Sequence, residues 1–388
     1  MAPHVFLVAV EDSGDALGAD VIRELRALEP DVRISGVGAS AMAAEGASAD
    51  VDLSGLSVVG LFDGVKALKR AKECVSEVAD LIQKADPDAV VLVDSWGFMW
   101  RLARELKLRG ARAKRIKLIG PQVWATRPGR AKVLAEWCDH LLCIHDFETP
   151  YYKRAGLPTT VIGNPALGRL KLGDAHRFRL KYDIPDTTDV IGLLLGSRKA
   201  ELRRVGPALV ESARRLTAGR SDRLVVGLAA PSVRQQILEM AQSWDFPHVI
   251  VTDNSDKSDA MAAMKISLAC SGTVTTELAA QGSAVLVGYK LGWVSWALAR
   301  LFLLKSPYIT LVNVAAGKEL APEFIQTRLR PDLIVEAAGQ RLSDAAVLAA
   351  QVEGQAAAIA KMRGQKNIPA ARVAAGTILD LSGSGLQP

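Results

Sequence analysis

The chain has little that would suit a secreted, membrane-spanning or nucleic-acid-binding protein. It contains only four cysteines and no CxxC pair, which favours a reduced cytoplasmic setting over a disulfide framework. Met1–Val10 lacks the basic start and cleavage site of a signal peptide and suits a first buried strand instead. Aromatic residues make up 5% and the basic residues are scattered, so we expect no nucleic-acid partner.

A zinc site is not expected either. Two cysteines and two histidines fall close together, at Cys138, His140, Cys143 and His145. Leu141–Ile144 has the composition of a strand, and side chains on a strand alternate between its two faces. His140 and Cys143 would then point apart, which a tetrahedral site does not allow. The first strand-to-helix junction, Ala9–Asp15, is not GxGxxG, so dinucleotide binding has no support there, and we expect neither a metal nor another cofactor.

What is present is the pattern of a two-domain α/β protein. The 388 residues are 49% hydrophobic and 23% charged, enough for two cores. Continuous apolar strands alternate with helices, which predicts parallel sheets covered on both faces. We expect a domain over residues 1–165, a linker over 166–189, a domain over 190–362, and a tail over 363–388 that could return to the first domain. A net charge of +6 suits an anionic partner.

One loop carries the most specific signal. Lys117–Arg130 (KLIGPQVWATRPGR) runs from an expected strand, Ile116–Ile119, to a helix that opens near Arg130. In open α/β sheets, ligands bind where strands end and helices begin. The segment resembles the SPQVWAWRPGR signature of lipid-A-disaccharide synthases, which are GT-B glycosyltransferases with two doubly wound Rossmann-like domains and a cleft between them. The resemblance recurs in order over roughly residues 4–330.

Further matches in the first half imply an acceptor site. Asp94 directly follows a buried strand in VVLVDSWGF and matches the position of the family's proposed general base; the alternative is a helix cap. Ala9–Asp15 (AVEDSGD) resembles AGEASGD, and a helix start there could hold an anion. The acceptor-site residues implied are Glu11, Ser13, Gly14, Gln122, Trp124 and Arg127, with Trp124 stacking on a sugar or covering an acyl chain.

Matches in the second half imply a UDP-sugar donor site. GLLLGSR, ending at Arg198, resembles LLPGSR, and CSGTVTTE, ending at Glu277, resembles SGTxxLE. A strand followed by Gly-Ser and a helix start suits a phosphate. In related enzymes the equivalent Glu accepts both ribose hydroxyls. The donor-site residues implied are Ser197, Arg198, Ser271, Gly272, Thr273, Glu277, Asn313 and Glu323.

The resemblance implies an inverting transfer of 2,3-diacylglucosamine from UDP-2,3-diacylglucosamine to 2,3-diacylglucosamine 1-phosphate (lipid X), forming a β-1,6 bond. Three positions depart from the family pattern: Asn164 replaces His, while Leu195 and Val312 each replace Pro. Two alternatives stay open, the second of them because of these departures. One is another UDP-sugar enzyme of this fold, a transferase or an epimerase, and the other is a non-catalytic UDP-sugar-binding paralogue.

Lipid substrates also imply contact with a membrane. Leu291–Leu304 is shorter than the roughly 20 residues needed to span a bilayer, but its aromatics and flanking cations suit an interfacial helix. Trp293, Trp296 and Phe302 are the predicted contacts with the anionic inner surface of the inner membrane, and a helix buried between domains or subunits is the alternative. We expect a cytoplasmic, peripheral protein, with a homodimer left open.

Overall fold

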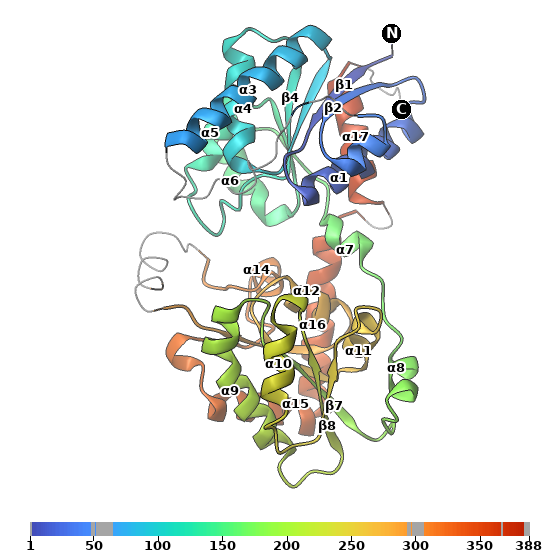
Figure 1. Cartoon of the computed structure of the whole chain (residues 1–388), viewed down its shortest axis with the longest axis vertical. Helices are drawn as coiled ribbons and strands as arrows, with labels where there is room; N and C mark the ends of the chain where they lie inside the picture. Colours follow the sequence, from blue (N-terminus) through green and yellow to red (C-terminus); the bar gives the residue numbers. More distant parts are fainter. Residues whose placement is uncertain are drawn as a thin grey trace. The chain divides into compact units, whose positions relative to one another are not determined.

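The computed structural model describes residues 2–47, 51, 65–292, 296, 306–365 and 368–383, with no side-chain description for residues 65–68. The chain divides into two compact units (Figure 1). The first unit contains Met1–Gly168 together with Met362–Pro388, and the second contains Arg169–Lys361.

The first unit is built on a parallel sheet, with strands in the order β2-β1-β3-β4-β5-β6. Its strands are short and apolar, and β1 and β3 are buried along their whole length. Such strands form where helices cover both faces of the sheet. The strands are β1 (His4–Val8), β2 (Arg33–Val37), β3 (Ala89–Val93), β4 (Lys114–Leu118), β5 (His140–Cys143) and β6 (Thr159–Val161).

Alternating side chains of each strand feed two cores. Val5 and Leu7 pack with α1 and α17, whereas Phe6 and Val8 pack with α3, α4 and α5. Figure 1 shows α17, from the end of the chain, beside α1 from its beginning. The helices are α1 (Asp12–Leu28), α2 (Ser40–Ala44), α3 (Val65–Ala85), α4 (Trp96–Leu108), α5 (Arg130–Trp137), the short η2 (Asp146–Glu148), α6 (Thr149–Arg154), α7 (Pro165–Arg169) and α17 (Ala370–Leu381).

The second unit repeats the plan with the strand order β12-β11-β10-β7-β8-β9, again all parallel. Ile191 and Leu193 of β7 are buried against α9 and α15. The strands are β7 (Asp189–Leu194), β8 (Arg223–Leu228), β9 (His248–Val251), β10 (Ile266–Cys270), β11 (Ala284–Tyr289) and β12 (Glu323–Ile325).

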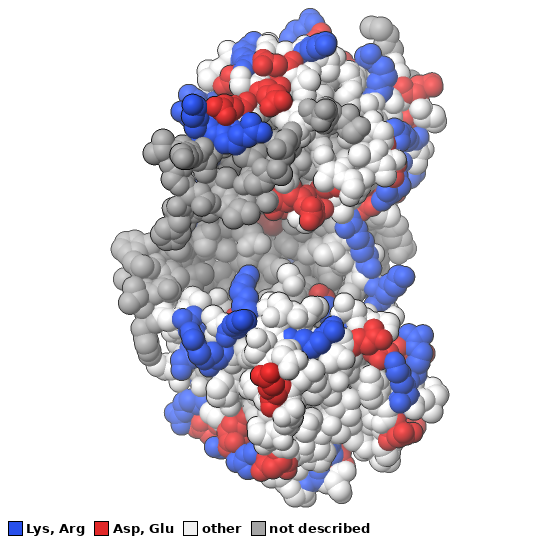
Figure 2. Space-filling view, in the orientation of Figure 1, with Lys and Arg blue, Asp and Glu red and all other residues white. Residues whose placement is uncertain are grey.

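The helices of this unit flank the sheet. They are α8 (Ala175–Lys181), α9 (Lys199–Thr217), η3 (Pro231–Val233), α10 (Arg234–Ala241), α11 (Lys257–Ala263), α12 (Thr273–Ala280), α14 (Leu311–Ala316), η5 (Gln326–Arg328), α15 (Pro331–Ser343) and α16 (Ala345–Arg363). Lys and Arg are interspersed with Asp and Glu on the visible face of each unit (Figure 2).

The stretch expected as a linker, 166–189, holds defined structure. Helix α8 packs on α11, where Arg177 donates to Asp259 at 2.8 Å. The chain re-enters the first unit after α16. There Gly163, with φ +85°, lies so close to Arg363 that a Cβ would sit 2.1 Å from the Arg363 carbonyl oxygen. Only glycine fits this crossing.

Both sheets have a point at which the strand order reverses. It falls between β1 and β3 in the first unit and between β7 and β10 in the second. In doubly wound sheets, ligands bind at the carboxyl ends of the strands beside this point. Among the described residues, no helix is long and apolar enough to cross a membrane.

Candidate functional site

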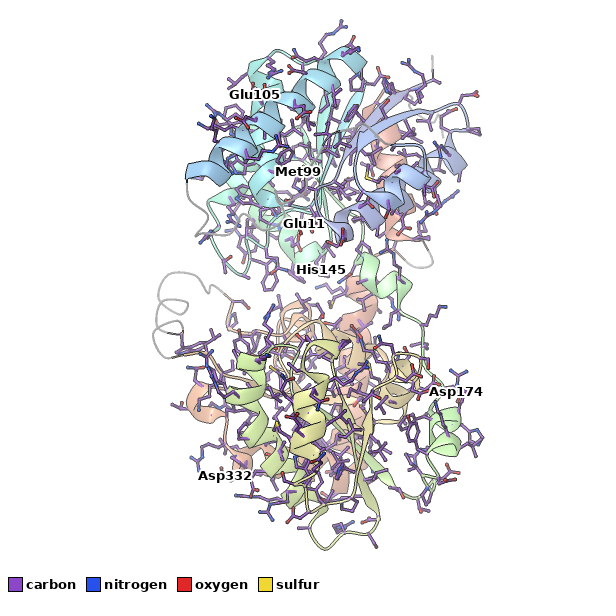
Figure 3. All side chains as sticks on the ribbon, viewed as in Figure 1. Glu11, Met99, Glu105, His145, Asp174 and Asp332 are labelled. Carbon is purple, nitrogen blue, oxygen red and sulfur yellow. The ribbon has the colours of Figure 1, made fainter. Side chains whose placement is uncertain are left out.

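The candidate acceptor residues lie at the carboxyl edge of the first sheet. Glu11 follows β1 and begins α1, and Asp94 follows β3, so the two flank the reversal in strand order. Figure 3 shows Glu11 and His145, which follows β5, at the same edge of the unit. Ser13 is exposed in the first turn of α1, and Gly14 packs against Val93. The sequence had predicted this location, because these residues directly follow expected strands.

Asp94 lies in an unusual turn. Asp94 has φ +48° and Ser95 has φ +33°, so two consecutive residues other than glycine adopt left-handed backbone. Such a conformation persists only where the surrounding structure holds it, and it concentrates at functional sites. The Asp94 N–H donates to the carbonyl of Leu118 at 2.8 Å, and its side chain is partly exposed.

Beneath this turn lies a buried lysine that the sequence reasoning did not single out. Lys117 of β4 is 1% exposed, and its ammonium donates to the carbonyls of Leu92, Leu118 and Asp94. Burial is the main cause that lowers the pKa of Lys117, to about 8, while the nearby Asp94 carboxylate acts in the opposite direction. The signal in the sequence that could have indicated this residue is a lysine within an otherwise apolar strand.

The loop after β4 presents some of its predicted residues and buries another. Gln122 and Arg127 are exposed, so both remain available to a ligand. Trp124 is only 7% exposed and packs edge-on against Phe147 at 5.3 Å. Trp124 is thus largely buried inside the unit, and its contact with a sugar or an acyl chain stays a prediction.

Two more titratable side chains are buried behind this loop. Burial raises the pKa of Glu148 to about 8 and lowers that of His145 to about 4, so both are neutral near pH 7. Glu148 Oε2 and His145 Nδ1 have no hydrogen-bond partner within the described part of the chain. The His145 ring stacks on Phe147 at 4.9 Å. Sequence spacing gave no sign of this burial.

The second unit contains a pocket of about 460 Å³ at the carboxyl ends of β7, β8, β9 and β10. It lies at the reversal between β7 and β10. Six of the eight predicted donor residues line it, namely Ser197, Arg198, Ser271, Gly272, Thr273 and Glu277. The resemblance had placed these residues in two separate motifs, and the fold brings them together.

The turn after β7 binds a carboxylate of the same chain, that of Glu201. Glu201 Oε2 accepts the N–H groups of Ser197 and Arg198 at 3.0 and 3.3 Å, and Glu201 Oε1 accepts from the Arg198 guanidinium at 2.8 Å. Gly196 has φ +102°, and a Cβ there would lie 2.7 Å from Glu201 Oε2. Glu201 therefore occupies the backbone donors that the sequence predicted for a phosphate.

Within the described part of the chain, no side chain occupies the start of α12 in this way. Its N-cap is Gly272, with no side-chain hydrogen bond to the helix start, and Gly272 and Thr273 are exposed. A helix N-terminus of this kind carries partial positive charge and suits an anion. One turn further on, Glu277 accepts from Lys257 Nζ at 2.6 Å. Lys257 also lines the pocket, and no motif had pointed to it.

The other two predicted donor residues, Asn313 and Glu323, do not line this pocket. Asn313 is fully buried; its amide donates to the Ala321 carbonyl and to Glu323 and accepts from two backbone N–H groups. The Glu323 carboxylate accepts from the backbone N–H of Ile309 and Thr310. The two side chains fix the segment from Ile309 to Glu323, so neither has a free polar atom aimed at a ligand.

The positions that depart from the family pattern have structural roles. Asn164 Oδ1 accepts the Ala166 N–H at 3.0 Å at the start of α7. Leu195 and Val312 are buried. Of the predicted membrane contacts, Trp293 and Phe302 lie outside the described residues, and Trp296 is partly buried.

The whole chain resembles one group of curated proteins. A family model described as lipid-A-disaccharide synthetase matches residues 5–375. The lipid-A-disaccharide synthase of Rhodospirillum centenum is 34% identical over 379 residues, covering 97% of this chain and 94% of its own. That of Gluconobacter oxydans is 34% identical over 378 residues, covering 97% and 90%.

Solved structures resemble the fold at low identity. A putative UDP-N-acetylglucosamine 2-epimerase from Listeria monocytogenes has a TM-score of 0.62 at 15% identity, covering 100% of this chain and 99% of its own. MurG of Acinetobacter baumannii has a TM-score of 0.60 at 13% identity, covering 97% and 99%. These likenesses confirm the predicted fold class of two Rossmann-like domains, as in GT-B enzymes, and nothing about substrates.

Proposed function

The chain belongs to the lipid-A-disaccharide synthase family, and we propose that it joins 2,3-diacylglucosamine from UDP-2,3-diacylglucosamine to lipid X. The protein is thus a glycosyltransferase of lipid A biosynthesis, and the proposal concerns its substrates and the residues that handle them. The acceptor 6-hydroxyl would attack the anomeric carbon of the donor, the bond to UDP would break, and the new β-1,6 linkage would carry the inverted configuration.

The pocket at the β7–β10 reversal is the observation that carries the donor assignment. It combines the uncapped start of α12, the Arg198 guanidinium and the Glu277 carboxylate in one pocket. An N-terminal helix end and an arginine stabilise negative charge, so both suit the diphosphate that leaves in the reaction. Glu277 could accept hydroxyl hydrogens of the ribose. We therefore assign the second unit to the donor.

We assign the first unit to the acceptor, with Asp94 as the general base. A base must reach the hydroxyl that it deprotonates, and Asp94 offers a partly exposed carboxylate at the sheet edge. In the proposed step, Asp94 takes the proton of the acceptor hydroxyl while the oxygen attacks. Glu11, Ser13, Gln122 and Arg127 are the other groups proposed to bind the acceptor, with Arg127 suited to its phosphate.

We also propose that the protein acts at the inner face of the inner membrane. Described residues of α4 and α5 add to the support from the Leu291–Leu304 sequence. Trp96, Trp100 and Trp137 are partly exposed, and Arg101 lies 4.6 Å from the centre of the Trp100 ring. Tryptophan with arginine suits the headgroup region of an anionic bilayer. A homodimer remains a prediction, which analytical ultracentrifugation would check.

The experiment that tests the proposal is direct. Purified protein would be incubated with UDP-2,3-diacylglucosamine and lipid X in detergent micelles, and we expect disaccharide and UDP in equal amounts. UDP binding without product would favour the non-catalytic paralogue. Conversion of UDP-N-acetylglucosamine to its 2-epimer would favour an epimerase. The family match already speaks for the synthase over both alternatives.

A further inference from the structure

We propose that Lys117 is a positioning residue for the transfer reaction, and that it acts by holding the turn that carries Asp94. The inference rests on the role of Asp94 in the proposed function. Lys117 reaches the backbone of the turn and not the acceptor, so its effect on the reaction passes through Asp94.

The position of Lys117 is costly for a charged side chain. Strand β4 lies between β3 and β5, and Lys117 is paired in register with Leu92 and Leu141. Both leucines are fully buried in the core that β3 and β5 share with α3, α4 and α5. An ammonium group in such surroundings is unfavourable unless its donors are satisfied. An apolar side chain would fill this site at lower cost, so the lysine calls for a reason other than packing.

The three N–H groups of the ammonium match the three carbonyls that they meet. Nζ donates to the Leu92 carbonyl at 3.1 Å, to the Leu118 carbonyl at 3.2 Å, and to the Asp94 carbonyl. The Leu118 carbonyl also accepts the N–H of Asp94 at 2.8 Å. Both backbone polar groups of Asp94 are therefore tied to β4, one directly and one through Lys117.

These contacts oppose the strain in the turn. Left-handed backbone is unfavourable for residues with a Cβ, and here Asp94 and Ser95 adopt it in succession. Without the donor from Lys117, the Asp94 carbonyl would lose its partner and the turn could relax to a common conformation. The carboxylate would then move, and displacement of a reacting group by about 1 Å can cost about 100-fold in rate.

The charge on Lys117 also changes within a pH range in which the enzyme can be assayed. Its titratable neighbours are Asp94 in the β3–α4 turn, Glu11 at the start of α1, and Cys138 at the end of α5. Burial raises the pKa of the Cys138 thiol to about 12, so Cys138 stays neutral. Since the pKa of Lys117 is about 8, the ammonium becomes an amine above that pH. An amine has two N–H groups for three carbonyls, and the turn should loosen.

The test compares Lys117→Met with Leu141→Met. Methionine is close to lysine in volume, is one heavy atom shorter and has no donor, and Leu141 is the paired neighbour in the same core. For Lys117→Met we expect kcat to fall about 10- to 100-fold. UDP affinity should stay within about two-fold, and the variant should remain folded, since removal of the buried charge offsets the loss of a donor to the three carbonyls. Leu141→Met should keep near-normal kcat.

A double variant separates positioning from general damage. In the Asp94→Asn background, Lys117→Met should add little further loss, because the two residues act as one unit. In the wild type, kcat should decline above pH about 8 while UDP affinity stays constant, and this decline should be absent from Lys117→Met. The wild-type profile remains informative if the methionine variant fails to fold.

Three results would overturn the inference: near-normal kcat in Lys117→Met, an equal loss of UDP affinity and kcat, or additive losses in the double variant. Failure of the proposed function looks different. In that case Asp94→Asn itself keeps normal turnover. If Asp94→Asn is inactive while Lys117→Met is normal, only the role of Lys117 is wrong.

Discussion

The ammonium of Lys257 lies 2.6 Å from a carboxylate oxygen of Glu277, inside the pocket proposed for the UDP-sugar. The pair joins the start of α11 to the second turn of α12, and both side chains keep part of their surface exposed. Glu277 thus enters the pocket already oriented by a cation. A carboxylate held in this way can accept ribose hydroxyls with little further ordering.

Replacing Glu277 with alanine should weaken UDP binding. A hydrogen bond to a charged group is worth roughly 1.5–3 kcal/mol, which corresponds to about 10- to 100-fold in affinity. Isothermal calorimetry would measure the change. Glu211→Ala is the matched control, because Glu211 forms ion pairs on α9 and does not line the pocket. Unchanged UDP affinity in both Glu277→Ala and Arg198→Ala would remove the donor site from this pocket.

Glu201→Gln should strengthen UDP binding. Glu201 holds the N–H groups of Ser197 and Arg198 and pairs with the arginine side chain. Glutamine still accepts the N–H groups but removes a negative charge near the expected diphosphate, an effect on the order of 1 kcal/mol, or about five-fold. Arg198→Ala should weaken binding in the same assay. Weaker binding by Glu201→Gln would mean that the carboxylate orients Arg198 and does not compete with the ligand.

Asp94→Asn should reduce turnover by about 10²- to 10⁴-fold, the contribution expected of a positioned base. UDP affinity should be retained, since Asp94 and the pocket belong to different units. Asp86→Asn serves as the control, because Asp86 precedes β3 and pairs with the exposed Arg112 at the opposite edge of the sheet. Near-normal turnover in folded Asp94→Asn would exclude Asp94 as the base.

Glu148→Gln should stabilise the protein above neutral pH. The folded-state pKa of Glu148 is raised to about 8 by burial, whereas the unfolded value lies near 4.5. The folded state therefore binds more protons between these values, and its stability falls as pH rises from about 4.5 to about 8. Glutamine does not ionise, so the variant avoids this loss. Above neutral pH its free energy of unfolding should exceed that of the wild type by a few kcal/mol at most. Urea unfolding at pH 6 and pH 8.5 would show it, and an equal effect at both would contradict the buried acid.

Membrane contact can be mapped by vesicle co-sedimentation. Trp100→Ser combined with Arg101→Ser should lower binding to vesicles containing phosphatidylglycerol, and salt should weaken binding of the wild type. Trp293→Ser with Trp296→Ser tests the predicted interfacial segment. Trp244→Ser is the control, since Trp244 stacks on Phe246 in the second unit. If neither pair reduces binding, these tryptophans face protein and the membrane surface lies elsewhere.

Local patterns in the sequence were sufficient to predict the architecture. Continuous apolar strands such as Ala89–Val93 and Val190–Leu195 predicted buried parallel sheets, and the structure has β3 and β7 there. The matched motifs also predicted the family, which the match over residues 5–375 confirms. These inferences succeed because strand burial and turn chemistry are encoded by neighbouring residues.

The exact partners of side chains were decided by tertiary structure. The sequence suggested that Trp124 could contact a ligand, yet its ring packs against Phe147 inside the unit. The Asn313 amide is hydrogen-bonded to Glu323 and to nearby backbone groups. Lys117 looked like one basic residue among many, and only the pairing of β3 with β4 places its ammonium under Asp94. Burial and hydrogen bonding depend on which distant segments meet, and that is settled by packing of the whole unit and not by any local stretch of sequence.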